Sequence, residues 1–264
     1  VYKRQTINKG STISGNVANY GGGVLVSGKD ITMSGGSITG NGTKGNNYRY
    51  GGGVCIAQYT DHDTQTPYSG VFTMTGGSIT GNTAGSRGAG VYFLNGGTFK
   101  VSGDANVTGN TVGNSANNVY LTDTDGVLTI IGPLNGAGFG ITAKSDTHFT
   151  SGWSNCMSGS DPTQFFTSDL DNRYVTLSGD EVELRDGYQI NYELNGGQFV
   201  SSYTPSYSYD GSQDVQLPGE DDITRNGYTF GGWYANEQFT GEPCTVTVSY
   251  THLRAHETKA NLVC

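Results

Sequence analysis

The sequence predicts an all-β fold in which short repeated units stack with their strands parallel. Three observations lead to this prediction: the abundance of glycine, a near-repeat of eleven residues, and apolar columns that recur in the same order. Glycine accounts for 43 of the 264 residues, and each glycine inside a helix costs about 0.5–1 kcal/mol relative to alanine. Long helices are therefore not expected.

The near-repeat consists of residues 31–41 (ITMSGGSITGN) and 72–82 (FTMTGGSITGN). Each copy contains two short apolar stretches separated by glycine, which predicts two successive strands. Equivalents of the first strand begin at Ile31, Phe72, Phe99 and Leu128. Equivalents of the second strand centre on Ile13, Ile38, Ile79 and Val107.

A further set of strands follows glycine turns. Its first column is Val24, Val54, Val91, Val119 and Phe139. Its third column, two residues on, is Val26, Ile56, Phe93, Leu121 and Ile141. The residues between them are Leu25, Cys55, Tyr92, Tyr120 and Gly140. Because side chains alternate across a strand, the first and third columns are predicted to face inward and the middle column outward.

The order of these strands never reverses, which favours parallel stacking, with each strand beside its equivalent in the next repeat. Glycine and asparagine suit the corners because both accept positive φ. Four asparagines at one repeat position are expected to form a side-chain amide ladder: Asn16, Asn41, Asn82 and Asn110. The spacing of the valine column varies, so extra residues are expected to form loops at 42–50 and 58–69.

This pattern resembles the right-handed parallel β-helix, and more closely the glycine-rich, adhesin-like β-helices of bacterial surface proteins. The resemblance covers residues 6–187 and implies about five to six coils. From about residue 153 a closing coil is expected, with a helical turn at 162–166 and strands at 174–177 and 181–184. An antiparallel sandwich or barrel is the alternative fold.

From Tyr188 the sequence changes in character and resembles the internalin-type B-repeat of bacterial surface proteins. The matching motifs are LNGG (194–197), LP (217–218), NGYTF (226–230), GWY (232–234) and FTG (239–241). The resemblance implies a small β-grasp-like (α+β) module at residues 188–247 that lacks the family's last strand. Phe230 and Trp233 are expected to anchor its core.

Both ends of the chain resemble translated sequencing adapter. Residues 248–264 can be encoded by a transposase-type adapter and residues 1–5 by its reverse complement, so we expect both to be artefacts without a native fold. The β-prone residues 246–253 can still pair as a surrogate last strand. Excluding the two ends removes four basic residues and one acidic residue, which changes the net charge from −9 to −12.

Composition limits the possible partners. An acidic chain with few Lys and Arg repels phosphate backbones, which argues against nucleic acid, and no apolar run is long enough to insert into a membrane. Only Cys55, Cys156 and Cys244 lie outside the adapter-like ends, and three cysteines define no disulfide framework. The resemblances imply an extracellular protein, secreted or attached to the cell wall, with host or microbial glycans or surface proteins as partners.

Two acidic motifs carry ligands suited to a metal ion. Asp61-His62-Asp63 combines carboxylates with an imidazole. Asp123 and Asp125 alternate as in calcium-binding loops but lack the later glutamate of an EF-hand. A solvated loop and a plain turn are the competing interpretations, and we predict neither a metal nor a cofactor.

Aromatic side chains offer a second kind of candidate site, since their faces can bind sugar rings. Five tyrosines lie at or near the loops of the first coils: Tyr20, Tyr48, Tyr50, Tyr59 and Tyr68. Packing over apolar strand edges is the alternative role. No motif indicates a Ser/His/Asp set or the paired carboxylates of a glycosidase, so no catalytic residue is predicted.

The sequence therefore predicts a non-catalytic segment of a bacterial surface or secreted protein that acts in adhesion, as a stalk or in glycan binding. The alternative is a β-helix polysaccharide lyase or glycoside hydrolase whose catalytic coils lie outside these residues or at their loops. The predicted stack requires Val24, Val54 and Val91 to be neighbours in space.

Overall fold

The computed structural model describes residues 5–45, 49–122, 126–143, 147–203, 208–209, 215–244, 246–247 and 252–259. The chain divides into two compact units: unit 1 is Val1–Asp171 with Val175–Arg185, and unit 2 is Asn172–Tyr174 with Asp186–Cys264. Strands dominate both units, and the described residues contain one short α-helix and two 3-10 helices. No helix in this part of the chain is long and apolar enough to cross a membrane. The all-β prediction is confirmed.

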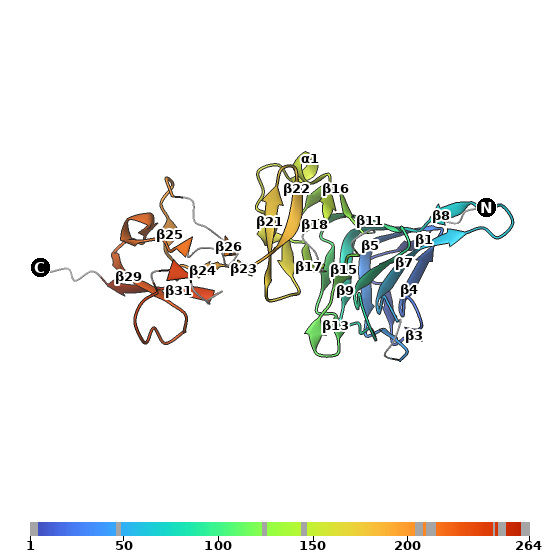
Figure 1. Cartoon of the computed structure of the whole chain (residues 1–264), viewed down its shortest axis with the longest axis horizontal. Coiled ribbons are helices and arrows are strands. Elements are labelled where there is room, and N and C mark those ends of the chain that lie inside the picture. The colour runs from blue at the N-terminus through green and yellow to red at the C-terminus, as the bar shows by residue number, and fades with distance from the viewer. Residues whose placement is uncertain are drawn as a thin grey trace, which may run out of the picture. The chain divides into compact units, whose positions relative to one another are not determined.

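Unit 1 is dominated by a 15-stranded sheet whose neighbouring strands run mostly parallel (Figure 1). The strands fall into three rows of equivalent positions. The first row is β4 (Val24–Ser27), β7 (Val54–Thr60), β10 (Val91–Leu94), β15 (Val119–Tyr120) and the end of β17 (Gly138–Thr142). The second row is β1 (Gln5–Ile7), β5 (Asp30–Thr39), β9 (Val71–Thr80), β11 (Thr98–Gly103), β16 (Leu128–Leu134) and β19 (Thr150–Ser151). The third row is β2 (Thr12–Ser14), the second halves of β5 and β9, β12 (Asn106–Thr108), the start of β17, and β20 (Phe166–Ser168).

Equivalent residues of successive repeats lie directly opposite one another. Val54 lies opposite both Val24 and Val91, and Ile38 lies opposite Ile79. The prediction that like residues stack on like is confirmed. The interior members of these columns are fully buried and belong to one continuous hydrophobic core.

Glycine at the start of the first row allows the repeats to approach closely. A Cβ on Gly53 would lie 2.7 Å from the carbonyl oxygen of Gly90 and 2.7 Å from Cγ2 of Ile79. No larger residue fits at this distance without displacing a neighbour. Gly51, two residues earlier, has a φ of 69°, which glycine adopts without strain. The Gly-Gly-Gly-Val segment is thus a corner followed by a close contact.

The fifth repeat has a register that differs from the sequence prediction. Phe139 was predicted to stack on Val119, but Val119 lies opposite Ile141, and Phe139 lies opposite Val107. The reason is that β17 has no asparagine corner, so a single strand continues from the third row into the first. A shift of two residues keeps the same face, and both Phe139 and Ile141 remain buried.

The last part of unit 1 departs from the repeat pattern. It contains α1 (Trp153–Met157), η1 (Pro162–Gln164) and most of the hairpin of β21 (Arg173–Ser178) and β22 (Glu181–Asp186), with β22 also antiparallel to β18 (Thr147–His148). The predicted helical turn and the two predicted strands are confirmed, whereas α1 was not predicted. Trp153 and Val182 are buried in the same core as the repeats, so these elements add to the stack.

The insertions between the repeats are more regular than predicted. Residues 58–69, expected to form a loop, form a hairpin in which β7 continues to Thr60 and pairs with β8 (Pro67–Ser69), projecting from the stack (Figure 1). The segment 42–50 begins with β6 (Gly42–Thr43), parallel to β3 (Val17–Ala18). A small hairpin of β13 (Thr111–Val112) and β14 (Ser115–Ala116) follows the fourth asparagine corner.

Unit 2 is built from short paired strands. The pairs are β23 (Tyr188–Gln189) with β26 (Ser208–Tyr209), β25 (Gln198–Phe199) with β28 (Ile223–Thr224), and β27 (Val215–Gln216) with β30 (Val246–Thr247). A three-stranded sheet contains β24 (Asn191–Glu193), β31 (His252–Lys259) and β29 (Tyr228–Tyr234), and η2 (Glu220–Asp222) precedes β28. The central β31 belongs to the adapter-like end, and its bounds differ from the predicted surrogate strand at 246–253.

Trp233 anchors the core of unit 2, as predicted. Its side chain is 1% exposed, and its indole Nε1 donates a hydrogen bond to the carbonyl oxygen of Pro218 at 2.8 Å. Phe230, the other predicted anchor, is only half-buried, with its ring centroid 5.5 Å from that of Trp233. Trp233 is therefore the more deeply buried of the two predicted anchors.

Candidate functional site

The Asp61-His62-Asp63 motif lies at the tip of the β7–β8 hairpin. Oδ1 of Asp61 accepts hydrogen bonds from the backbone nitrogens of Asp63 (3.0 Å) and Thr64 (2.9 Å) and from Oγ1 of Thr64 (3.0 Å). The bonds from Thr64 hold the pKa of Asp61 below its usual value. This carboxylate therefore closes its own turn, and the described residues contain no group of three His, Cys, Asp or Glu placed to hold a metal ion. Asp123 and Asp125 lie outside the described residues.

Tyr20 and Tyr50, two of the ligand candidates, belong to an aromatic row that runs across the repeats. The ring centroids of Tyr20 and Tyr50 are 6.0 Å apart, those of Tyr50 and Tyr92 are 4.4 Å apart, and those of Tyr92 and Tyr120 are 5.9 Å apart. The guanidinium carbon of Arg87 lies 5.2 Å from the centroid of the Tyr120 ring. A sugar needs an open aromatic face, but these faces lie largely against one another, so this arrangement suits packing.

Tyr59 and Tyr68 lie apart from that row, directly opposite each other on β7 and β8. A Cβ added to Gly28 would lie 2.9 Å from Cβ of Tyr59 and 3.3 Å from Cβ of Tyr68, so both tyrosines rise from the same side of the hairpin. Tyr59 is 49% exposed. This pair offers aromatic surface to solvent, whereas the remaining candidate, Tyr48, lies outside the described residues.

The predicted asparagine ladder forms a polar network that crosses the repeats of unit 1. At each step, the backbone nitrogen and Nδ2 of one asparagine donate to Oδ1 of the next. Asn41 donates both bonds to Asn82 at 3.0 Å, and Asn82 donates to Asn110 at 3.0 and 2.9 Å. Nδ2 of Asn82 also donates to the carbonyl oxygen of Ile38 at 2.9 Å. The interior asparagines are buried, so the ladder satisfies polar groups that water cannot reach.

The ladder continues through two residues that sequence reasoning missed. Asn110 donates to Oδ1 of Asn118 at 2.8 and 3.0 Å. Asn118 in turn donates from its backbone nitrogen and Nδ2 to the two carboxylate oxygens of Asp169, each at 2.7 Å. A Cβ on Gly140 would lie 2.3 Å from both Nδ2 of Asn118 and Oδ1 of Asp169, so glycine leaves room for this contact. The available signal was that Asn118 precedes Val119, where glycine precedes the valine in the other repeats.

Asp169 is the only acidic residue in this ladder and ends it among the described residues. Burial raises the pKa of its carboxyl group, although the hydrogen bonds from Asn118 and Thr142 act in the opposite direction. A raised pKa in the folded state means that the protonated form is favoured by folding. Its contribution to stability is therefore fully present below the unfolded-state pKa and is lost as pH rises through the folded-state pKa.

We expect Asp169→Asn to remove this pH dependence. The asparagine Oδ1 can accept both bonds from Asn118 as the other ladder members do, and the amide carries no titrating charge. As pH rises through the folded-state pKa of Asp169, the free energy of unfolding of the wild type should fall relative to that of the variant. Denaturant unfolding between acid and neutral pH measures this. Asp169→Ala, which removes the acceptors altogether, should be destabilised at every pH.

The surroundings of Cys55 disfavour a reactive thiol. Burial raises the pKa of the Cys55 thiol to about 12, so thiolate is scarce at neutral pH. Cys55 packs beside Tyr92 and Tyr120 in a small buried cluster on the outer side of the first row. Cys55 therefore acts as a small packing residue.

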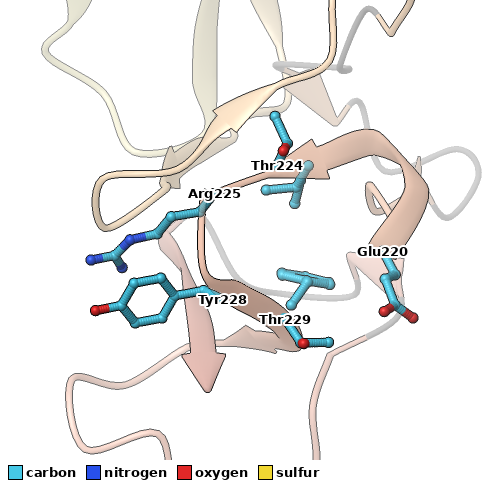
Figure 2. Close-up of a pocket in the computed structure, with 7 residues that line it drawn as sticks. Glu220, Thr224, Arg225, Tyr228 and Thr229 are labelled. Atoms are coloured by element: carbon cyan, nitrogen blue, oxygen red, sulfur yellow. The ribbon is translucent and has the colours of Figure 1, made fainter. Parts of the chain in front are cut away.

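Unit 2 contains a shallow pocket of about 170 Å³ formed mainly by β28, β29 and the turn between them (Figure 2). Its lining residues are Glu220, Ile223, Thr224, Arg225, Tyr228, Thr229 and Phe230. The guanidinium carbon of Arg225 lies 4.0 Å from the centroid of the Tyr228 ring. These two side chains extend together on the side away from Glu220 (Figure 2). The charged groups therefore do not converge on one ligand position.

Comparison with known proteins bears on unit 2. No curated protein and no solved structure matches the chain. The family model of the Listeria-Bacteroides repeat domain matches residues 188–255, which include eight residues of the adapter-like end. This repeat is found in bacterial surface proteins. Residues 188–255 are thus similar to a bacterial surface repeat, the class that the sequence predicted for this part of the chain.

Proposed function

We propose that this chain is a non-catalytic, extracellular segment of a bacterial surface protein. In this proposal unit 1 is a right-handed parallel β-helix that serves as a stiff adhesive stalk, and unit 2 is a β-grasp-like repeat module that accompanies it. The proposal takes its location from the family match at residues 188–255. Its mechanical role depends on the stacking of unit 1.

The observation that carries the proposal is the continuous register of the repeats. Every interior repeat hydrogen-bonds to both neighbours through its strands, and the asparagine ladder ties the corners together. A stack held by backbone and side-chain bonds at each step resists local opening, because one repeat cannot detach without exposing buried polar groups. Such a body suits a load-bearing or spacing role.

Two partly buried acidic side chains of unit 1, Asp169 and Glu181, also support a structural role. Asp169 ends the ladder through Asn118 and Thr142. Glu181 accepts hydrogen bonds from the backbone nitrogens of Gly152 (2.7 Å) and Trp153 (3.1 Å), which binds the start of α1 to β22. Each of these carboxylates is occupied in holding one segment of chain to another.

The adhesive part of the proposal is assigned to the Tyr59–Tyr68 pair. Exposed aromatic faces bind the apolar faces of sugar rings, and this pair lies on the β7–β8 hairpin beside Gly28, at the end of the first row. The β-helix therefore positions the contact residues, and the hairpin presents them to glycans.

The test is binding of the purified chain to immobilised mucin, pectin and alginate, with a parallel assay for released reducing sugar. We expect retention on at least one polymer without release of sugar. Tyr59→Ala should weaken that binding roughly 2- to 10-fold, the loss expected for one aromatic contact. Leu177→Ala, which changes an equally exposed apolar residue on β21, should leave it unchanged. Release of sugar by this chain would instead support the polysaccharide-degrading alternative.

A further inference from the structure

The first repeat presents a face that differs from the corresponding face of every interior repeat. Among the described residues, β1 and β2 pair only with β5, and β4 pairs only with β7. The strands of the next two repeats have partners on both sides. The backbone N–H and C=O groups on the outer edges of β1, β2 and β4 are therefore in position to hydrogen-bond with a further parallel strand.

The apolar columns show the same difference. Val54 and Val91 are fully buried, as is Ile79 in the third row. The equivalent residues of the first repeat, Val24 and Ile13, are only partly buried although they pack against the same core. At these two positions the core reaches the open face without being covered to the same degree, whereas Val26 and Ile7 of the same repeat are buried.

Asn16 shows which partner fits this face. The ladder has a direction: each asparagine donates to the next repeat and accepts from the previous one. Asn16 donates from its backbone nitrogen and Nδ2 to Oδ1 of Asn41 at 3.1 and 2.9 Å. Oδ1 of Asn16 corresponds to Oδ1 of Asn41 and Oδ1 of Asn82. Each of those two atoms accepts two hydrogen bonds from the preceding asparagine of the ladder. Asn16 is exposed, whereas Asn41 is 1% exposed.

We propose that the open face of the first repeat binds a further repeat of the same kind, running parallel and carrying an asparagine opposite Asn16. The occupant is specified by three complementary features: strand edges for β1, β2 and β4, apolar side chains over Ile13 and Val24, and an amide that donates to Oδ1 of Asn16. The contacts in this interface would be equivalent to those that already join the first repeat to the second.

A second copy of the chain, bound through its own first repeat, does not provide the hydrogen-bond donor that this face requires. Two first repeats placed face to face would bring Oδ1 of one Asn16 towards Oδ1 of the other, and neither is a donor. The opposite end of the stack is not available for head-to-tail contact in the same way, because β19 and β20 are followed by the β21–β22 hairpin, whose Val182 and Leu184 are buried in the core. The direction of the ladder therefore selects a preceding repeat.

The experiment adds one repeat to the full chain. Gln5 lies opposite Ile31, so residues 5–30 make up one repeat, and a second copy of them replaces residues 1–4. We expect the added repeat to resist limited proteolysis and to raise the Tm by roughly 2–4 °C or more. Hydrogen exchange of the backbone amides in β1, β2 and β4 should slow at the same time.

The matched control carries Asn16→Ala in the original repeat, both with and without the added copy. The gain in Tm from the added copy should be clearly smaller in the Asn16→Ala background, because the acceptor on the open face is gone. Proteolytic removal of the added repeat at the rate of an unfolded tail would overturn the proposal, as would a wild-type dimer that the added repeat dissociates. Either result would leave the proposed surface role standing, because that role depends on the stacking of the repeats within unit 1 and not on its open face.

Discussion

Replacing Asn82 by alanine is expected to lower the free energy of unfolding by roughly 3 kcal/mol or more, because several buried polar groups lose their partners at once. Oδ1 of Asn82 accepts from the backbone nitrogen and Nδ2 of Asn41. Its Nδ2 donates to the carbonyl oxygen of Ile38 and to Oδ1 of Asn110. All three asparagines are buried, so water cannot replace these bonds. Urea unfolding of unit 1 measures the loss.

The control for this prediction is Asn16→Ala at the exposed end of the ladder. Asn16 donates to Asn41 by the same geometry, but water reaches it and can replace part of what is lost. We expect a loss of about 1 kcal/mol or less. Equal losses at the two positions would mean that the ladder contributes through local corner geometry and not through burial of a connected network.

Much of the stack could be predicted because its determinants are local and repeated. Alternation around Val54 and Val91 identifies the inward face, and glycine before each valine marks the corner and the close contact. Asn41 and Asn82 were predicted to stack because they occupy the same place in two nearly identical segments. Each of these inferences needs only the order of residues within one repeat.

The failures occur where a feature depends on residues outside the repeat. The register of Phe139 was wrong because β17 omits a corner and joins two rows, which only the neighbouring strands reveal. The role of Asp169 was missed because it meets Asn118 across 51 residues of sequence. The hairpin at 58–69 was missed because its pairing depends on a chain reversal within a polar segment.

The candidate site was less predictable than the fold for the same reason. The sequence selected tyrosines near loops, but only the spatial arrangement separates the Tyr20–Tyr50 row, whose rings lie against neighbours, from the exposed Tyr59. Likewise, the carboxylate of Asp61 has the chemistry of a metal ligand, yet its hydrogen bonds close a turn. The sequence could select candidates by residue type. Only the tertiary contacts show which of them are exposed and which are occupied by packing or by hydrogen bonds.

Ile79→Ala is the second substitution with a large expected effect. Ile79 is fully buried, lies opposite Ile38 and Val107 in the adjacent repeats, and has Cγ2 in contact range of Gly53. Removing its side chain leaves a cavity between two repeats whose backbones are fixed by hydrogen bonds and cannot collapse freely. A loss of about 2–5 kcal/mol in the free energy of unfolding is expected, measurable by urea or thermal denaturation.

Thr73→Ala provides the matched comparison, because Thr73 lies on the same strand, β9, but points outward. It lies opposite Thr32 and Lys100, so its neighbours are polar and half-buried. The substitution should change the free energy of unfolding by no more than about 0.5 kcal/mol. Both residues lie on β9, in an interior repeat. Their position in the backbone therefore cannot explain a difference between the two losses of unfolding free energy. Similar losses at Ile79 and Thr73 would therefore contradict the assignment of inward and outward faces on which the stacked core depends.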